Sequence, residues 1–301
     1  MSEELGRVVA SHGRRVLVES ARGERVPCTL LGRRLQAVCG DEVRWRPDTM
    51  AGHGIVVERL PRRTALERTN ARGGAEPLVA NLTQLLVVFA HEPRPDYFIV
   101  DRYVAAAELL GLRAIVARNK SDAGALPPPG PEELENYARL GYHTIECSAE
   151  DGSSIVALDE QLRGQVTVLV GQSGVGKSSL ANRLLPGLEA KTAELSAATE
   201  EGRHVTSVAV LLHLPGGGDL VDSPGVRDFA PAIELLGQPA RAFREIEALA
   251  PGCRFSDCRH LREPDCAVRE AVSAGRILER RYESYRRLNR LSEKLAPPPG
   301  G

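Results

Sequence analysis

The chain has 301 residues, 42% of them hydrophobic, which is enough for two or three domains that each bury a core. Its net charge of −1 gives no overall field that favours a nucleic-acid partner, although residues 1–68 carry thirteen arginines against nine acidic residues. The apolar runs are only as long as strands, which argues against membrane insertion. The first residues contain no basic region followed by an apolar stretch, which argues against export. The six cysteines are unevenly distributed, with two in the first forty residues and three within Cys253–Cys266, so we expect a cytoplasmic protein without disulfides. We also expect a monomer.

Residues 1–68 predict a small β-barrel. Five short segments are apolar or β-branched in alternation, and turn-forming clusters separate them. The segments are Leu5–Ala10, Arg14–Glu19, Arg25–Leu31, Glu42–Arg46 and Gly54–Leu60. Five strands without a long helix favour an OB-type barrel, with an SH3-like barrel or an open sheet as the alternatives.

Residues 69–232 predict an α/β domain with a parallel sheet covered by helices, because apolar strands alternate with helical stretches. The strands are Leu82–Ala90, Arg113–Ala117 and Val166–Val170, and the helices are Tyr97–Leu110, Pro131–Leu140 and Ser178–Leu185. Residues 233–301 would form a third, helical domain. In it Ala267–Leu295 has a helical pattern with eight basic residues against four glutamates, which fits either a solvated face or a phosphate-contacting surface.

A phosphate loop lies between the strand that ends at Val170 and the helix that begins at Ser178. Its residues satisfy the pattern G-x-x-x-x-G-K-[ST]: Gly171, Gln172, Ser173, Gly174, Val175, Gly176, Lys177 and Ser178. The glycines let main-chain N–H groups face phosphate oxygens, and Lys177 adds charge for the β and γ phosphates. The Ser178 hydroxyl and the Asp222 carboxylate are placed to hold Mg²⁺.

A candidate base-recognition loop follows the strand Arg113–Ala117 and consists of Asn119, Lys120, Ser121 and Asp122. The Asp122 carboxylate can accept hydrogen bonds from guanine N1–H and the 2-amino group, a donor pair that adenine lacks. Asn119 and Lys120 would brace the loop and cover the base. Ser148 and Ala149, after a further strand, would complete the guanine pocket from the main chain.

The motifs occur in an unusual order. The base-recognition loop precedes the phosphate loop, which in turn precedes a switch segment near residue 206 and the D-x-P-G sequence at Asp222. This order is a circular permutation of the small GTPases, and a pocket assembled in three dimensions tolerates such a change of termini.

A metal cluster is predicted near the C-terminus. Cys253, Cys258, His260 and Cys266 form the pattern C-x₄-C-x-H-x₅-C. Three thiolates and one imidazole suit a single, closed, tetrahedral structural Zn²⁺, and four protein ligands leave no open position for catalysis. Unligated cysteines beside a surface histidine are the alternative.

Four segments together resemble the RsgA/YjeQ family of circularly permuted GTPases. They are GQSGVGKSSL, EGRHVTS, DSPGVRDF and CRFSDCRH with EPDCAVREAV, and the resemblance covers essentially the whole chain. It implies an OB-fold RNA- or ribosome-binding domain at 1–68, a permuted GTPase domain at 69–232 and a helical zinc-binding domain at 233–301. It also implies a role in late maturation of the small ribosomal subunit, with subunit-stimulated GTP hydrolysis and contact with rRNA.

Residue by residue, the resemblance places Ser179 on the phosphates, Thr206 in the first switch with Mg²⁺, and Asp222 to Gly225 in the second switch. His204 matches a histidine that helps to position the attacking water, with an exposed loop residue as the alternative. Val226 stands where Ras-like enzymes carry a glutamine, and valine cannot orient water.

Three functions compete at this point. The first is a GTPase switch on small-subunit RNA, which binds GTP and GDP with Mg²⁺. The second is a nucleotide-gated RNA- or protein-binding module on another ribosomal particle, with incidental hydrolysis. The third is an ATP-dependent kinase, which Asp122 disfavours because its carboxylate matches guanine. The domains predicted on either side of the core favour the first.

Overall fold

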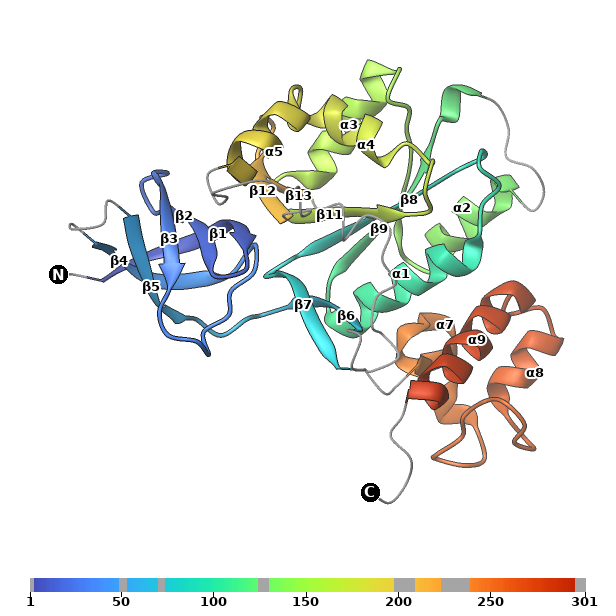
Figure 1. Cartoon of the computed structure of the whole chain (residues 1–301). Coiled ribbons are helices and arrows are strands. Elements are labelled where there is room, and N and C mark those ends of the chain that lie inside the picture. The colour runs from blue at the N-terminus through green and yellow to red at the C-terminus, as the bar shows by residue number, and fades with distance from the viewer. Residues whose placement is uncertain are drawn as a thin grey trace.

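A computed structural model describes residues 3–48, 53–69, 74–123, 130–197, 209–222 and 239–295. An N-terminal barrel and a C-terminal helical domain lie against different parts of a central α/β domain (Figure 1). The strands of the barrel and of the central domain form one sheet in the order β10-β9-β8-β11-β13-β12-β1-β2-β3-β5-β4.

The barrel confirms the OB-type prediction. Its strands are β1 (Glu4–His12), β2 (Arg15–Ser20), β3 (Arg25–Leu30), β4 (Glu42–Asp48) and β5 (His53–Arg59). They pair in the order β1-β2-β3-β5-β4 and close through β4 onto β1, with β3 and β5 parallel. Val8, Val18, Trp45 and Val56 fill the barrel core. Inward apolar side chains at every second position therefore produce the closed sheet.

A two-stranded ribbon that the sequence did not predict follows the barrel. It consists of β6 (Ala65–Thr69) and β7 (Ala75–Ala80), which pair antiparallel. Val79 of the ribbon forms a β-bridge with Cys39, so the ribbon packs beside the barrel.

The central domain is a doubly wound α/β sheet. Its elements are β8 (Gln84–Ala90), α1 (Tyr97–Leu110), β9 (Arg113–Asn119), α2 (Gly130–Arg139), β10 (His143–Glu146), α3 (Gly152–Leu162), β11 (Val166–Gly171), α4 (Lys177–Leu184), α5 (Leu188–Ala197), β12 (Ala209–His213) and β13 (Asp219–Asp222). Strands β10, β9, β8, β11 and β13 are parallel, and among the described strands of the central domain only β12 is antiparallel to its neighbours. Helices α1 and α2 cover one face, and α3, α4 and α5 cover the other (Figure 1). The seven residues of β8 are all buried, as expected for a central parallel strand.

Two helical features differ from the sequence predictions. Helix α5, which was not predicted, occupies Leu188–Ala197. The stretch Ala267–Leu295 was expected to be one helix, yet it is divided into α8 (Ala267–Ser273) and α9 (Glu279–Leu295). Gly275 adopts a φ of +71° at the break, a left-handed conformation that glycine takes readily and that ends a helix.

The C-terminal domain consists of α7 (Arg244–Glu247), α8 and α9 around its own apolar cluster. That cluster includes Phe243, Ile246 and Tyr285, and also Ala105 and Ala106 of α1. One face of α1 therefore belongs to the core of the C-terminal domain, which fixes that domain to the central one. No helix in the described ranges combines the length and apolarity needed to cross a bilayer.

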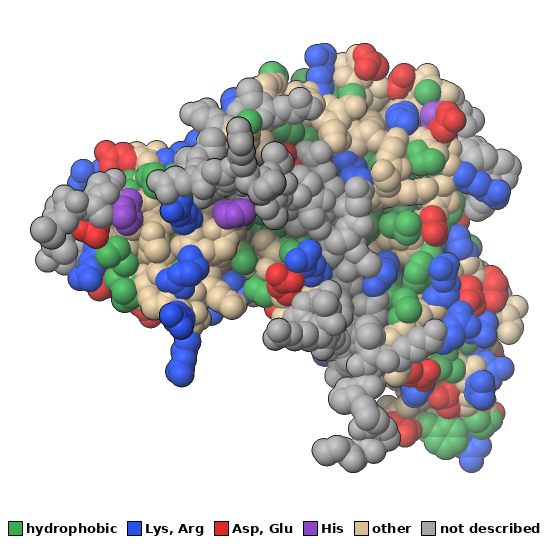
Figure 2. All heavy atoms as spheres, in the orientation of Figure 1, with side chains coloured by type: hydrophobic (Ala, Val, Ile, Leu, Met, Phe, Trp, Pro, Cys, Tyr) green, Lys and Arg blue, Asp and Glu red, His purple; other side chains and the backbone are tan. Residues whose placement is uncertain are grey.

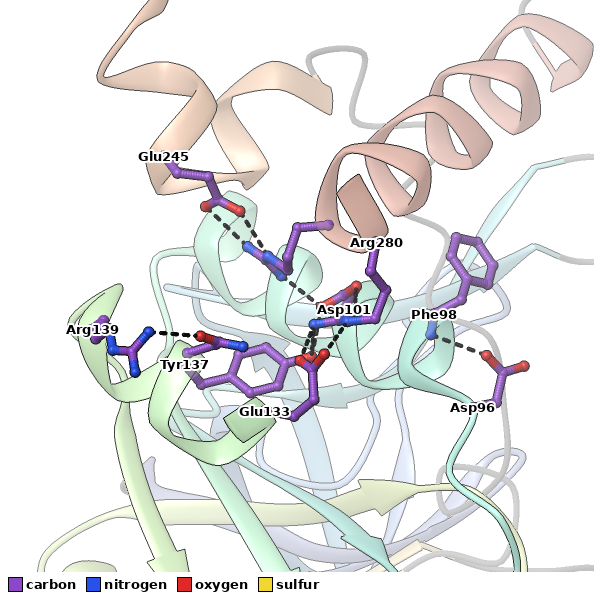
Figure 3. Close-up of polar contacts among 10 residues, drawn as sticks. Asp96, Phe98, Asp101, Glu133, Tyr137, Arg139, Glu245 and Arg280 are labelled. Carbon is purple, nitrogen blue, oxygen red and sulfur yellow. Dashed lines mark hydrogen bonds and ion pairs between the residues drawn. The ribbon is translucent and has the colours of Figure 1, made fainter. Parts of the chain in front are cut away.

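A buried ion-pair network joins these two domains (Figure 3). Asp101 of α1 is fully buried and accepts from Arg280 at 2.6 Å and from Arg281 at 2.7 Å. Arg280 continues to Glu133 of α2 at 2.6 Å, and Arg281 continues to Glu245 of α7 at 2.7 Å. Buried charges are tolerated when each is paired and hydrogen-bonded, and this network meets that condition across four helices.

The Asp101→Asn variant tests the network. Asparagine keeps the shape of the side chain but leaves two arginines without their shared carboxylate, so the free energy of unfolding should fall by about 3–5 kcal/mol at neutral pH. Urea unfolding measures the loss. Glu135→Gln is the control, because Glu135 pairs with Arg139 on the surface and should matter by less than about 1 kcal/mol.

The pH dependence has a defined sign. Desolvation raises the pKa of Asp101, but the charges of Arg281 and Arg280 outweigh it and hold that pKa below its ordinary value of 3.8. The stabilisation is therefore present above pH 3.8 and is lost as the pH falls through the lowered pKa. Asp101→Asn should lack this part of the acid transition. Equal unfolding midpoints for Asp101→Asn and Glu135→Gln would contradict the assignment.

Candidate functional site

The candidate nucleotide site lies at one edge of the central sheet. Strands β9, β10, β11 and β13 are parallel, so the loops that follow them meet at their carboxyl ends. Those loops carry the base-recognition loop after Asn119, the pocket loop at Ser148, the phosphate loop after Gly171, and Asp222. The structure thus brings together predicted residues that are up to about a hundred positions apart.

The phosphate loop is shaped by glycines that no other residue can replace. Gly171 has a φ of +143°, and a side chain there would collide with the carbonyl oxygen of Val88 in β8. Gly176 has a φ of +89°, and a side chain there would collide with the side-chain amide of Asn119. The Lys177 Nζ is buried and donates to the carbonyl oxygens of Gly171 and Gln172 at 2.8 and 2.9 Å. The ammonium group therefore sits within the curl of the loop, where phosphate oxygens would lie.

The base-recognition loop is hydrogen-bonded to the phosphate loop. Asn119 Nδ2 donates to the Val175 carbonyl at 2.8 Å, and Lys120 Nζ donates to the Gly174 carbonyl at 3.0 Å. Lys120 has a φ of +59°, which turns the chain sharply after β9, and Asp122 is exposed beyond it. Asn119 and Lys120 therefore set the distance between the two loops, while the Asp122 carboxylate stays accessible to a ligand.

The pocket loop is closed by its own side chains. Asp151 caps α3, and the Ser154 hydroxyl accepts from the Ser148 N–H at 3.0 Å. The N–H of Ala149 makes no hydrogen bond within the described part of the chain, so it is the main-chain donor that this loop can offer a base. Behind the loop, burial raises the pKa of the Cys147 thiol to about 12, which keeps the thiol neutral and apolar.

The predicted magnesium ligands Ser178 and Asp222 lie on neighbouring elements. Ser178 is in the first turn of α4, and Asp222 ends β13, which pairs parallel with β11. Asp222 is buried, and Thr192 of α5 donates to its Oδ2 at 3.4 Å. One hydroxyl and one carboxylate fit a hard cation that keeps several waters and phosphate oxygens as its other ligands.

Sequence reasoning missed one segment that belongs to this site. Residues 91–96 join β8 to α1 and lie against both loops: the Glu92 carbonyl accepts from Lys120 Nζ at 2.9 Å, and the Asp96 N–H donates to Gln172 Oε1 at 3.1 Å. Thr192 was also missed. The position of residues 91–96 after a predicted parallel strand could have indicated them, whereas Thr192 has no sequence signal.

Three predicted residues lie outside the described ranges: His204, Thr206 and Gly225. The remaining predicted nucleotide residues, Ser121, Ser173 and Ser179, lie in the two loops and the first turn of α4.

The predicted metal ligands converge in the C-terminal domain. The ligand atoms of Cys253, Cys258, His260 and Cys266 all lie within 4.8 Å of one another. The Sγ atoms of Cys253 and Cys266 are 3.8 Å apart, and His260 Nδ1 is 3.4 and 3.5 Å from them. Metal–ligand bonds of about 2.0–2.3 Å in a tetrahedron place neighbouring ligand atoms roughly 3.4–3.8 Å apart. The cluster therefore fits one tetrahedral metal ion.

Helix α9 and a buttressing carboxylate hold the metal loop in place. Tyr282 donates to the His260 carbonyl and Tyr285 to the Arg259 carbonyl, each at 2.6 Å. Glu263 accepts from three main-chain N–H groups of the loop. Desolvation raises the pKa of Glu263, but these hydrogen bonds lower it to about 2, so the carboxylate stays charged.

The basic residues of α9 are less available than their number indicates. Arg280, which is partly buried, and Arg281, which is fully buried, belong to the interdomain network, and Arg286 and Arg290 share Glu283. In Figure 2, Lys and Arg side chains on the C-terminal domain are interspersed with Asp and Glu side chains. Any phosphate-binding surface on this domain would thus be a small group of basic residues rather than a continuous basic stripe.

Comparison with known proteins agrees with this geometry. The sequence model of the RsgA GTPase family matches residues 59–231. A protein of Chromohalobacter salexigens named small ribosomal subunit biogenesis GTPase RsgA is 43% identical over 293 residues, which cover 95% of this chain and 85% of the relative. A protein of the same name from Pseudomonas aeruginosa is 43% identical over 288 residues, with the same shares covered.

Two solved structures share the fold. YjeQ from Thermotoga maritima superposes with a TM-score of 0.73 at 31% identity, covering 96% of this chain and 99% of that one. YloQ, a circularly permuted GTPase, has the same TM-score at 22% identity over 98% and 97% of the two chains, and shows likeness of fold alone. The chain therefore belongs to the RsgA GTPase family and is a GTP hydrolase whose nucleotide-binding domain is circularly permuted.

Proposed function

We propose that this GTPase binds the small ribosomal subunit, that the subunit stimulates its hydrolysis of GTP, and that hydrolysis is coupled to late maturation of the subunit or to release from it. The hydrogen bonding of the base-recognition loop to the phosphate loop carries the proposal, in a chain whose relatives are named for small-subunit biogenesis. Such a site fixes the position of the base relative to the phosphates, as a nucleotide switch requires.

Guanine would be read by Asp122 and by the main chain of the pocket loop. The Asp122 carboxylate accepts from N1–H and the 2-amino group, while the Ala149 N–H donates to the base oxygen. Asn119 and Lys120 are already engaged with Val175 and Gly174, so their role is to position Asp122. Adenine would leave the carboxylate unpaired, which gives the selectivity.

The phosphates would be held by the main-chain N–H groups of Gly171 to Ser179 and by Lys177. On binding, the Lys177 ammonium would exchange its loop carbonyls for phosphate oxygens. Ser178, Asp222 and Thr206 would hold Mg²⁺, which supplies charge stabilisation to the leaving phosphate when bound. Thr192 orients the Asp222 carboxylate from α5.

Water would be positioned by His204, because Val226 offers no hydrogen bond at the place after D-x-P-G. With the histidine on a long connection between α5 and β12, the protein alone should turn over slowly, at roughly 10⁻⁴ to 10⁻² per second. The subunit would complete the site by bringing His204 to the γ-phosphate.

The flanking domains offer arginine-lined pockets for rRNA phosphates. A pocket of about 730 Å³ between the barrel and the start of β7 includes Arg14 and Arg33 together with Glu76. One of about 450 Å³ on the C-terminal domain includes four arginines together with Glu263 and Glu293. Trp45 is buried in the barrel core, so it offers no stacking platform for a base. The contacts we propose are therefore with RNA backbone and shape rather than with bases.

Asp122→Asn tests the guanine assignment. Xanthine carries an oxygen where guanine has its amino group, so the asparagine amide should shift preference from GTP toward xanthosine triphosphate. Equilibrium binding of both nucleotides, with ATP as the control ligand, measures the change. A variant that still prefers GTP would show that another group reads the base.

Metal content tests the C-terminal cluster, for which we propose one structural Zn²⁺. Elemental analysis should find about one zinc per chain, and chelation should expose the amides of α8 and α9 to hydrogen exchange, because a structural zinc contributes folding energy directly. Amides of β2 and β3 in the barrel serve as the internal control. A metal-free protein with fully protected α8 and α9 would refute the proposal.

His204→Ala tests both the water-positioning role and the partner. GTP affinity should stay nearly unchanged, while turnover stimulated by purified small subunits should fall by about 10²-fold, the range for a lost positioning or acid–base group. His143→Ala is the control, since His143 is exposed on β10. Unchanged stimulated turnover would remove His204 from the mechanism. A wild-type protein that neither responds to small subunits nor co-sediments with them in the presence of a GTP analogue would exclude the partner.

A further inference from the structure

Strands β12 and β13 form a hairpin that connects the two switch regions. The segment with His204 and Thr206 precedes β12, and Asp222 ends β13, where it lies opposite Val210 in the antiparallel register. A shift or loosening of β12 therefore acts on the proposed water-positioning segment and on the proposed magnesium carboxylate together.

The barrel contacts this hairpin through its first strand. Ala10 and Ser11 of β1 pair with Val210 and Ala209 of β12, which makes the barrel and the central domain one continuous sheet. A β-bulge around Val9 enables this change of partner. Before the bulge Val8 points into the barrel core, and after it Val9 and Ala10 belong to the central core.

A histidine bridges the two domains at the end of this pairing. His213 closes β12, and its Nδ1 lies 2.6 Å from Asp219 Oδ1 of β13 while its Nε2 lies 2.8 Å from Glu19 Oε1 of the barrel. A neutral imidazole donates only one hydrogen bond, so both contacts are satisfied only by the imidazolium form. The side chain is half exposed, so it exchanges protons with solvent.

The charges around His213 favour its protonated form. Arg7 of β1 pairs with Asp219 at 2.6 Å, and Arg25 of β3 pairs with Glu19 at 3.0 Å, so each carboxylate also has one arginine. Desolvation lowers the pKa of His213, but its hydrogen bonds to Asp219 and Glu19 outweigh this and raise the pKa above its ordinary value of 6.5. The bridge is therefore complete below pH 6.5 and is lost as the pH rises through the raised pKa.

We propose that the His213 bridge, together with the β1–β12 pairing, is the joint through which the barrel controls the switch hairpin. With the bridge formed, the barrel holds β12 and β13 in register, and a force on the barrel reaches both switches. With His213 neutral, one of the two carboxylates loses its hydrogen bond from the imidazole, and the Arg7–Asp219 pair and the β1–β12 pairing alone hold the hairpin to the barrel. His213 is thus a positioning residue for GTP hydrolysis, at a distance from the nucleotide.

Hydrogen exchange of the isolated full-length protein tests the joint without any partner. Protection factors of the β12 amides should fall as the pH rises through the raised pKa of His213. His213→Gln should reduce the protection of the β12 amides at every pH, because the neutral glutamine amide carries no positive charge to attract the two carboxylates. His213→Arg should keep the protection and remove its pH dependence, because arginine stays charged. His143→Gln, an exposed histidine at the far edge strand β10, is the matched control. Wild-type protection in His213→Gln, or the same pH profile in His213→Arg and wild type, would overturn the joint.

Turnover tests whether the joint serves hydrolysis, and this part rests on the proposed function. Small-subunit-stimulated kcat should fall by about fivefold or more in His213→Gln, in the range of typical coupling between sites, and should be restored in His213→Arg with a flat pH profile. GTP affinity should not change. Full stimulation in His213→Gln would refute the role in hydrolysis. If wild type shows no stimulation, the proposed partner is wrong, while the exchange profile still decides whether the joint exists.

Discussion

Parallel strand pairing at the centre of the sheet is the constraint on which the rest of this structure depends. Because β9, β8, β11 and β13 run in the same direction, every loop that leaves their carboxyl ends reaches the same edge. The bond from Asn119 to Val175 joins loops that are 56 residues apart in the chain, and it needs only that β9 and β11 lie on either side of β8. The order of the motifs along the chain is therefore irrelevant to the pocket. It matters for what is attached to the pocket, because the switch strands now adjoin the barrel on one side and lead to the metal domain on the other.

Much of the nucleotide site could be predicted because its information is local. The phosphate loop is recognised from glycine spacing between a strand and a helix, and each glycine answers a steric demand visible within a few residues. The same holds for Asn119 to Asp122 and for the spacing of Cys253 to Cys266. The five barrel strands were likewise predicted to within about two residues, since alternating burial leaves a direct trace in sequence.

The remaining features are set by partners distant in sequence. Arg280 and Arg281 read as part of a solvated basic helix, and only the docking of α9 on α1 shows that Asp101 takes both of them into the interior. The β1–β12 pairing was equally invisible, because β1 satisfies the pattern of a barrel strand along its whole length. Helix α5 was missed because its apolar and polar residues follow no clear helical period.

Strand β1 pairs with both the barrel and β12 of the central domain, and this affects how the chain folds during synthesis. The barrel emerges from the ribosome first, but β12 follows β1 by about 200 residues, a delay of roughly 10–40 s at ordinary elongation rates. During that interval the second half of β1 is an unpaired edge next to Val9 and Ala10, both of which are buried in the finished protein. The nascent barrel thus exposes a short strand edge, able to pair with other strands, until the β12–β13 hairpin has been synthesised. The same contact that lets the barrel act on the switches is the last part of the barrel to be covered.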